Sequence, residues 1–158
     1  MKVAFFSEIG NNQRYPRNFP NARTEVAWCL TLEAPMLMLN PSQKERIDEH
    51  FDLGIVIIPK ENPDKIDWDW VRSKCDVVSV MQEGPHWYFQ DYSVDKQFHY
   101  YNALVEADRV YCHNESDVNY YLGLGCKDVR VMRSLMIPAG LPSRGDDEIG
   151  SGGIILGG

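Results

Sequence analysis

The chain has 158 residues, of which 44% are hydrophobic and 25% charged, which is typical of a folded globular protein. Its formal net charge of −7 disfavours nucleic acid as a general partner, because the field of the protein would repel it. No apolar stretch approaches the roughly 20 residues that span a bilayer, and the N-terminus lacks the long apolar region of a signal peptide. Four cysteines without a Cys-x-x-Cys pair indicate reduced, buried thiols in a cytoplasmic protein and no metal site.

The first half of the chain alternates short apolar runs with segments of helical spacing, which is the pattern of βαβ units. We expect strands at residues 3–6, 35–39 and 53–59. A long polar loop, residues 9–23, separates the first strand from a helix at residues 24–33. Two Asn-Pro pairs, Asn40-Pro41 and Asn62-Pro63, are typical helix starts. They predict one helix with Phe51 on its inner face and another that extends to Cys75.

The second half continues the same alternation. Strands are expected at residues 76–81, 109–112 and 129–132, with a short and a long helix in residues 85–107 and a helix at residues 114–124. The pattern predicts an α/β fold: a doubly wound, mostly parallel Rossmann-like sheet of about six strands with helices on both faces. In such sheets ligands bind beyond the carboxyl ends of the strands.

The end of the chain departs from this alternation. Residues 137–150 are rich in Pro, Gly, Asp and Arg and are expected to form a linker after a domain of residues 1–136. Residues 151–158 contain an apolar run followed by Gly-Gly, which is typical of the first strand and turn of another nucleotide-binding unit. A disordered or edge-packed tail is the alternative interpretation.

Candidate ligand-binding side chains follow the first strand. Glu8 and Asn11 come directly after it, and the loop then carries Arg14, Arg17 and Arg23 with no acidic residue among them. Guanidinium groups suit phosphate, carboxylate or hydroxyl-rich ligands, although an ordinary solvated loop is an equal alternative. The missing Gly-x-Gly-x-x-Gly and P-loop motifs disfavour an NAD-binding domain, a P-loop enzyme and a nucleotide-sugar epimerase.

The end of the fourth strand carries the most specific segment. Glu83 could act as a base or hold sugar hydroxyls, and His86 could do either or bind a phosphate. Gly84 breaks the chain there, and Trp87 offers a flat face that suits a sugar ring, with core packing as its alternative role. His113, which closes the fifth strand, is a further candidate for the cleft.

Several short motifs together resemble the N-terminal domain of GT-B glycosyltransferases, in particular the glycosyl transferases group 1. They are the strand–long-loop–helix opening of residues 3–33, Glu83-Gly84 at a strand end, and residues 107–114 (ADRVYCHN) followed by Asp117. Residues 131–140, which include Ile-Pro-Ala-Gly, are similar to the passage that enters the second domain of that family.

The resemblance implies two Rossmann-like domains that face a cleft. The first would bind a carbohydrate or glycolipid acceptor, and a missing C-terminal domain would bind most of the nucleotide sugar, so that the 158-residue piece alone would be inactive. Glu83 and His86 would lie near the reacting sugar, with no metal and no cofactor beside the nucleotide-sugar donor. A domain face left unsatisfied invites homo-oligomerisation. The alternative is a stand-alone flavodoxin-like binding or interaction module without catalysis.

Overall fold

The fold is known from a computed structural model that describes residues 1–17, 19, 22–40, 48–82 and 86–137. It contains a seven-stranded sheet of order β2-β4-β1-β5-β6-β7-β8, in which all neighbours are parallel except the edge pair β2–β4. The strands of this sheet are β1 (Val3–Ser7), β2 (Gln13–Arg14), β4 (Pro35–Met38), β5 (Phe51–Ile58), β6 (Cys75–Gln82), β7 (Arg109–Cys112) and β8 (Val129–Val131). A separate antiparallel pair joins β3 (Ala22–Arg23) to β9 (Met136–Ile137). The expected α/β, mostly parallel sheet is confirmed.

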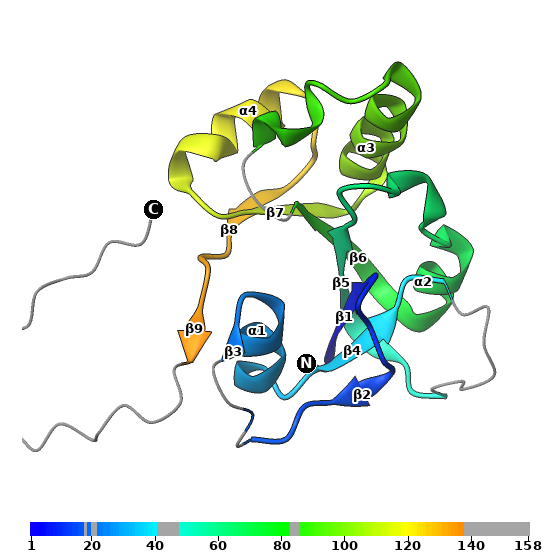
Figure 1. Cartoon of the computed structure of the whole chain (residues 1–158), viewed down its shortest axis with the longest axis vertical. Helices are drawn as coiled ribbons and strands as arrows, with labels where there is room; N and C mark the ends of the chain where they lie inside the picture. The colour runs from blue at the N-terminus through cyan, green and yellow to red at the C-terminus, as the bar shows by residue number, and fades with distance from the viewer. Residues whose placement is uncertain (18, 20–21, 41–47, 83–85, 138–158) are drawn as a thin grey trace, which may run out of the picture.

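Helices cover both faces of the sheet, as predicted (Figure 1). Along the sheet, the connection from β1 to β4 runs in one direction, and the connections from β5 through β8 run in the other. Because crossovers are right-handed, the first helix therefore lies on the opposite face of the sheet from the later helices. On one face lies α1 (Glu25–Thr31). On the other lie α2 (Trp68–Lys74), α3 (Val94–Glu106) and α4 (Val118–Gly123), and three 3-10 turns occur at η1 (Pro63–Lys65), η2 (His86–Phe89) and η3 (Glu115–Asp117).

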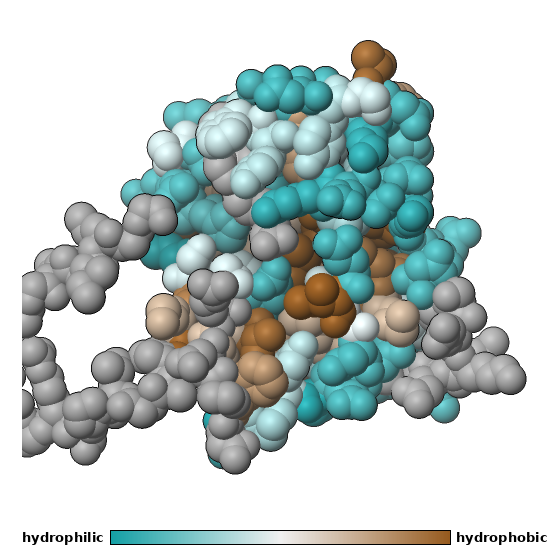
Figure 2. Space-filling view, in the orientation of Figure 1, coloured by the Kyte–Doolittle hydropathy of each residue, from teal (hydrophilic) through white to brown (hydrophobic). Residues whose placement is uncertain are grey.

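Two hydrophobic clusters, one on each face, hold these layers together. All five residues of β1 are buried. Phe6 packs on the side of α2, α3 and α4, and Phe5 stacks on Trp28 of α1 with ring centroids 6.1 Å apart. Figure 2 shows mostly hydrophilic residues over α3 and α4, while hydrophobic residues are visible in the hollow between these helices and α1. Because β1 is an interior strand buried on both faces, the residue that follows it lies at the carboxyl edge of the sheet, between the ends of β4 and β5.

Some expected elements have different bounds. Phe51, predicted on the inner face of a helix, begins β5, where it pairs with Cys75 and is 1% exposed. The predicted helix that ends at Cys75 is instead the turn η1 followed by α2, and Cys75 belongs to β6. The predicted loop of residues 9–23 includes the short strands β2 and β3. Residues 41–47 lie outside the described residues.

The described part of the domain ends on a strand. Ile137, expected as the first linker residue, pairs with Ala22 in the β3–β9 ribbon. The rest of the predicted linker and the predicted start of a second domain, residues 138–158, lie outside the described residues. None of the helices in the described part of the chain has both the length and the apolar character that crossing a bilayer requires.

Candidate functional site

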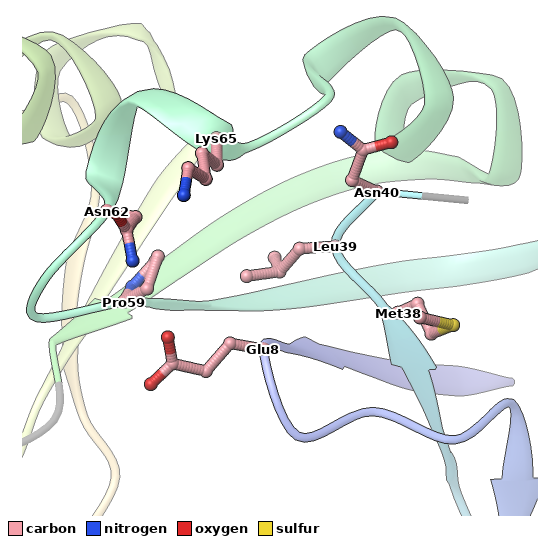
Figure 3. Close-up of a pocket in the computed structure, with 7 residues that line it drawn as sticks. All are labelled: Glu8, Met38, Leu39, Asn40, Pro59, Asn62 and Lys65. Atoms are coloured by element: carbon pink, nitrogen blue, oxygen red, sulfur yellow. The ribbon is translucent and has the colours of Figure 1, made fainter. Parts of the chain in front are cut away.

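A pocket opens where the direction of strand connection reverses, at the carboxyl ends of β1, β4 and β5. Its volume is about 220 Å³, and we call it the first pocket (Figure 3); its lining consists of Glu8, Met38, Leu39, Asn40, Pro59, Asn62 and Lys65. This reversal is the topological switch point, at which open α/β sheets bind their ligands. The structure thus places Glu8 at the edge where a ligand was expected.

The lining of the first pocket follows from the chain path. Glu8 is the residue after β1, Pro59 is the residue after β5, and Leu39 follows β4. The turn η1 begins after Asn62, whose carbonyl accepts a hydrogen bond of 3.1 Å from the Lys65 amide. Leu39 and Pro59 are buried and form an apolar floor. Figure 3 shows the Glu8 carboxylate on one side of this floor and the Asn62 and Lys65 side chains on the other.

The polar side chains of the first pocket are available to a ligand. Between described residues, no hydrogen bond or ion pair engages the side chains of Glu8, Asn40, Asn62 or Lys65. Together they present one carboxylate, two amides and one ammonium around the apolar floor. Concave, partly apolar sites with a few convergent polar groups are the usual form of small-ligand sites.

Gly10 and Asn11 have structural contacts beside this pocket. A Cβ on Gly10 would lie 2.0 Å from the Leu37 carbonyl oxygen, so only glycine lets the loop pack against β4. The Asn11 side chain accepts a hydrogen bond of 3.2 Å from the Gln13 amide, and Asn11 is not among the residues that line the first pocket. These contacts turn the chain back along β4.

Arg14 and Arg17 lie elsewhere than the sequence suggested. Because β2 runs antiparallel to β4, Arg14 is opposite Pro35, the first residue of β4, and hence at the amino end of that strand. The Arg14 guanidinium binds the Glu49 carboxylate at 3.0 Å and also donates to the backbone carbonyl of Glu33. The Arg17 guanidinium donates to the Glu33 carboxylate. The expectation that these arginines gather at the carboxyl end of β1 is therefore wrong, and the structure does not bring them together with Glu8.

The predicted residues after β6 are only partly described. Glu83 and Gly84 lie outside the described residues, and His86 begins η2 while its side chain is not described. Trp87 is 54% exposed and stacks on Tyr88 with ring centroids 5.3 Å apart. The catalytic roles of Glu83 and His86 stay predictions, and Trp87 is exposed as a ligand-stacking role requires.

His113 belongs to a second pocket at the same edge, at the ends of β7 and β8. We call it the second pocket; its volume is about 400 Å³ and its lining is His113, Asn114, Glu115, Ser116, Arg133 and Ser134. The His113 ring stacks on Trp28 with centroids 5.8 Å apart. Its Nε2 lies 3.1 Å from the Gln82 carbonyl oxygen and its Nδ1 lies 3.4 Å from the Ser134 hydroxyl.

Sequence reasoning missed several residues of the two pockets. Asn40 and Asn62 were interpreted as helix caps, and Lys65 was not singled out. Their position shortly after the second and third predicted strands was the available signal, since that position puts them at the ligand edge. Arg133 and Ser134 carried the same signal after the sixth strand.

One motif residue that carries the family resemblance has a structural contact. The Asp108 carboxylate accepts a hydrogen bond of 2.9 Å from the Val78 amide, and the Asp108 amide donates to the Val78 carbonyl at 3.0 Å. Asp108 precedes β7 and so lies at the amino edge of the sheet, away from both pockets. This aspartate joins β6 to β7, which gives the motif a folding role.

The cysteines are free and buried, and the described residues contain no group of three or more His, Cys, Asp and Glu side chains placed to hold a metal ion. Burial raises the pKa of Cys29 and Cys75 to about 12, so these thiols are not nucleophiles at neutral pH. Comparisons with protein-family models, curated proteins and solved structures give no significant match for this chain. The geometry of the carboxyl edge is therefore the ground for a functional proposal.

Proposed function

We propose that this chain is the acceptor-binding domain of a sugar-nucleotide-dependent glycosyltransferase and that the first pocket holds a sugar of the acceptor. The carboxylate of Glu8 can accept hydrogen bonds from two neighbouring hydroxyls, and the amides of Asn40 and Asn62 can both donate and accept. The apolar floor of Leu39 and Pro59 suits the C–H face of a sugar ring. Lys65 adds a cation for an anionic sugar or for the phosphate of a glycolipid acceptor.

The observation that carries this proposal is the convergence of these polar side chains at the switch point without partners among the described residues. Glu8, Asn40 and Lys65 are exposed and Asn62 is half-buried, so a ligand can reach these groups and has only water to displace from them. In the proposed enzyme, a further domain binds most of the nucleotide sugar, and the present domain binds the acceptor. The free thiols suit a reducing compartment, and we place the enzyme in the cytoplasm.

Ligand-observed NMR tests the proposal. Saturation transfer from the protein is measured to oligosaccharide and glycolipid-headgroup acceptors, to UDP- and GDP-sugars, and to the free nucleotides. We expect transfer to an acceptor sugar, and the Kd from a titration should rise about tenfold in Glu8→Gln or Lys65→Gln, which corresponds to about 1.4 kcal/mol of binding free energy. Glu106→Gln and Lys127→Gln are matched controls, because both residues are exposed and lie before strands, at the opposite edge.

The outcomes separate the possible roles. Binding of an acceptor that depends on Glu8 supports the acceptor domain. Binding of nucleotides alone, with no effect of the Glu8 substitution, contradicts an acceptor site in the first pocket. Absence of binding by every sugar and nucleotide at millimolar concentration contradicts the whole proposal.

The strand order favours a second candidate function. The successive strands β4-β1-β5-β6-β7 correspond to the order 2-1-3-4-5 of flavodoxin-like modules, which bind their ligand at this switch point. A stand-alone binding or interaction module without catalysis would use the same pocket. FMN is added to the NMR experiment as a further ligand, and its binding favours this module. An open reading frame that continues beyond Gly158 into a nucleotide-binding domain favours the transferase.

A further inference from the structure

The second pocket is separate from the first. The ends of β5 and β6 lie between β1, which positions Glu8, and β7, which positions His113. Neighbouring strands are about 5 Å apart, so the ends of β1 and β7 lie about 15 Å from each other along the sheet edge. One sugar ring cannot contact both, and the second pocket must be considered as a site of its own.

The hydrogen bonds of His113 determine which ring nitrogen carries the proton. The Gln82 carbonyl oxygen, 3.1 Å from Nε2, can only accept a hydrogen bond, so Nε2 donates. In the neutral ring Nδ1 then carries a lone pair, and the Ser134 hydroxyl, 3.4 Å away, donates to it. His113 therefore presents Nδ1 as a hydrogen-bond acceptor toward the second pocket, where the Ser134 hydroxyl makes a long hydrogen bond to it.

The surroundings of His113 hold this acceptor in place. Trp28, which is 5% exposed, stacks on the ring, and its indole N–H donates to the Arg133 carbonyl at 3.1 Å. The Gln82 side chain, on the other side, accepts hydrogen bonds from the buried hydroxyls of Tyr100 and Tyr121. Trp28 and Gln82, which contact the His113 ring, are thus held by further hydrogen bonds, and the orientation of the ring is set before any ligand arrives.

The charge of the second pocket favours a neutral ligand. Among the described residues that line it, the one cation is Arg133, which forms an ion pair of 2.9 Å with Glu115, so the two charges offset each other. The remaining described lining groups are the Asn114 amide and the hydroxyls of Ser116 and Ser134, and of these Asn114 and Ser116 donate to the Asp117 carboxylate at 3.5 and 3.3 Å. A ligand hydroxyl can donate to His113 Nδ1 and accept from the second N–H of the Asn114 amide, whereas the Arg133 charge that a phosphate would need is already paired with Glu115.

We propose that the second pocket is a separate polyol-binding subsite in which a hydroxyl of the ligand donates to His113 Nδ1 in place of the Ser134 hydroxyl. The ligand class is a neutral sugar or cyclitol. This subsite does not depend on the role of the first pocket. If both sites are filled by one molecule, that molecule is an oligosaccharide rather than a single sugar.

NMR titration of the whole chain tests the subsite with myo-inositol, glucose and inorganic phosphate, each added alone. Long-range ¹H–¹⁵N spectra of the histidine ring should show the Nε2–H tautomer in the free protein and after myo-inositol or glucose binds. His113→Gln keeps an N–H within reach of the Gln82 carbonyl but removes the Nδ1 acceptor, and it should weaken polyol binding at least tenfold. Ser134→Ala should leave the affinity unchanged or raise it, because the competing hydroxyl is gone.

Several outcomes would overturn the proposal. They are an Nδ1–H tautomer, phosphate binding that protonates the ring, polyol binding by His113→Gln equal to that of the wild type, and loss of binding in Ser134→Ala. Ser73→Ala, which removes a helix-surface hydroxyl bonded to the Trp70 carbonyl at 2.7 Å, is the matched control. Glu8→Gln separates this site from the first pocket: polyol shifts around His113 must survive that substitution.

Discussion

The amino edge of the sheet and the first pocket at its carboxyl edge use charged residues in opposite ways. At the amino edge the charges pair with one another: Arg109 lies 2.8 Å from Asp128, and Arg14 lies 3.0 Å from Glu49. In the first pocket the side chains of Glu8 and Lys65 have no such partner among the described residues. Both edges are polar, and composition alone does not distinguish them.

The difference shows how to separate folding residues from candidate ligand-binding residues in this domain. A charge that already has a partner would lose that interaction when it binds a ligand, which reduces the net gain. A solvated, unpaired side chain beside an apolar floor loses only water. The following predictions, from the largest expected effect to the smallest, test whether this division between the two edges holds.

The largest effect is expected at Gly10, a structural residue close to the first pocket. Gly10→Ala places a methyl group 2.0 Å from the Leu37 carbonyl oxygen, and the backbone must shift to remove the clash. We expect a loss of about 3 kcal/mol in the free energy of unfolding, measured by urea denaturation. Gly123→Ala is the control, since no atom lies within 4 Å of the added methyl group, and equal stability of the two variants would contradict the packing at Gly10.

Asp108 is the corresponding structural residue of the amino edge. Asp108→Ala removes the acceptor of the Val78 amide, a bond of 2.9 Å, and should lower the free energy of unfolding by about 1–2 kcal/mol. Ligand binding at the carboxyl edge should be unchanged. The exposed carboxyl of Asp91 provides the control substitution Asp91→Ala. A stable Asp108 variant that fails to bind ligands would assign this aspartate to the binding site and would contradict the division into a structural amino edge and a ligand-binding carboxyl edge.

A pH titration examines the paired charges of the amino edge directly. Hydrogen bonds from Arg109, and then from Arg130, lower the pKa of the Asp128 carboxyl. The stability from this group is present above the ordinary pKa of an aspartate and is lost as the pH falls through the lowered one. Carboxyl-detected ¹³C NMR should show the lowered pKa, with a larger rise in Arg109→Gln than in Arg130→Gln. An Asp128 carboxyl that titrates at its ordinary pKa would mean that the pairing is not maintained in solution.

The sequence predicted the framework because buried parallel strands are long apolar runs bounded by polar residues. The strand at residues 109–112 has the predicted bounds, and Glu8 and His113 lie at the carboxyl ends of strands, as predicted, while their binding roles stay predictions. A two-residue strand such as β2 has no periodicity to detect. Without β2 the direction of the first loop was unknown, and so the position of Arg14 was wrong.

Other parts of the site were ambiguous for a physical reason. An Asn-Pro pair after a strand both caps a helix and lines the sheet edge, and only the capping role was recognised for Asn40 and Asn62. Phe51 is apolar, as inward-facing residues of both helices and strands are, so its character does not distinguish the two. Its pairing with Cys75 involves a residue far along the chain. The local sequence pattern therefore predicted the helices and strands better than it predicted the contacts between them.

The smallest effect is expected for the arginines of the first loop. The side chains of Arg17 and its partner Glu33 are 89% and 70% exposed, so Arg17→Gln should change the free energy of unfolding by less than about 0.5 kcal/mol. Arg14→Gln, with a half-exposed side chain, should lose at most about 1 kcal/mol. Neither should alter sugar binding, because both side chains lie toward the amino end of β4. If Arg17→Gln keeps its stability but loses acceptor binding in the NMR experiment, the ligand extends along β4 to the opposite edge, and paired charges can no longer be excluded from the site.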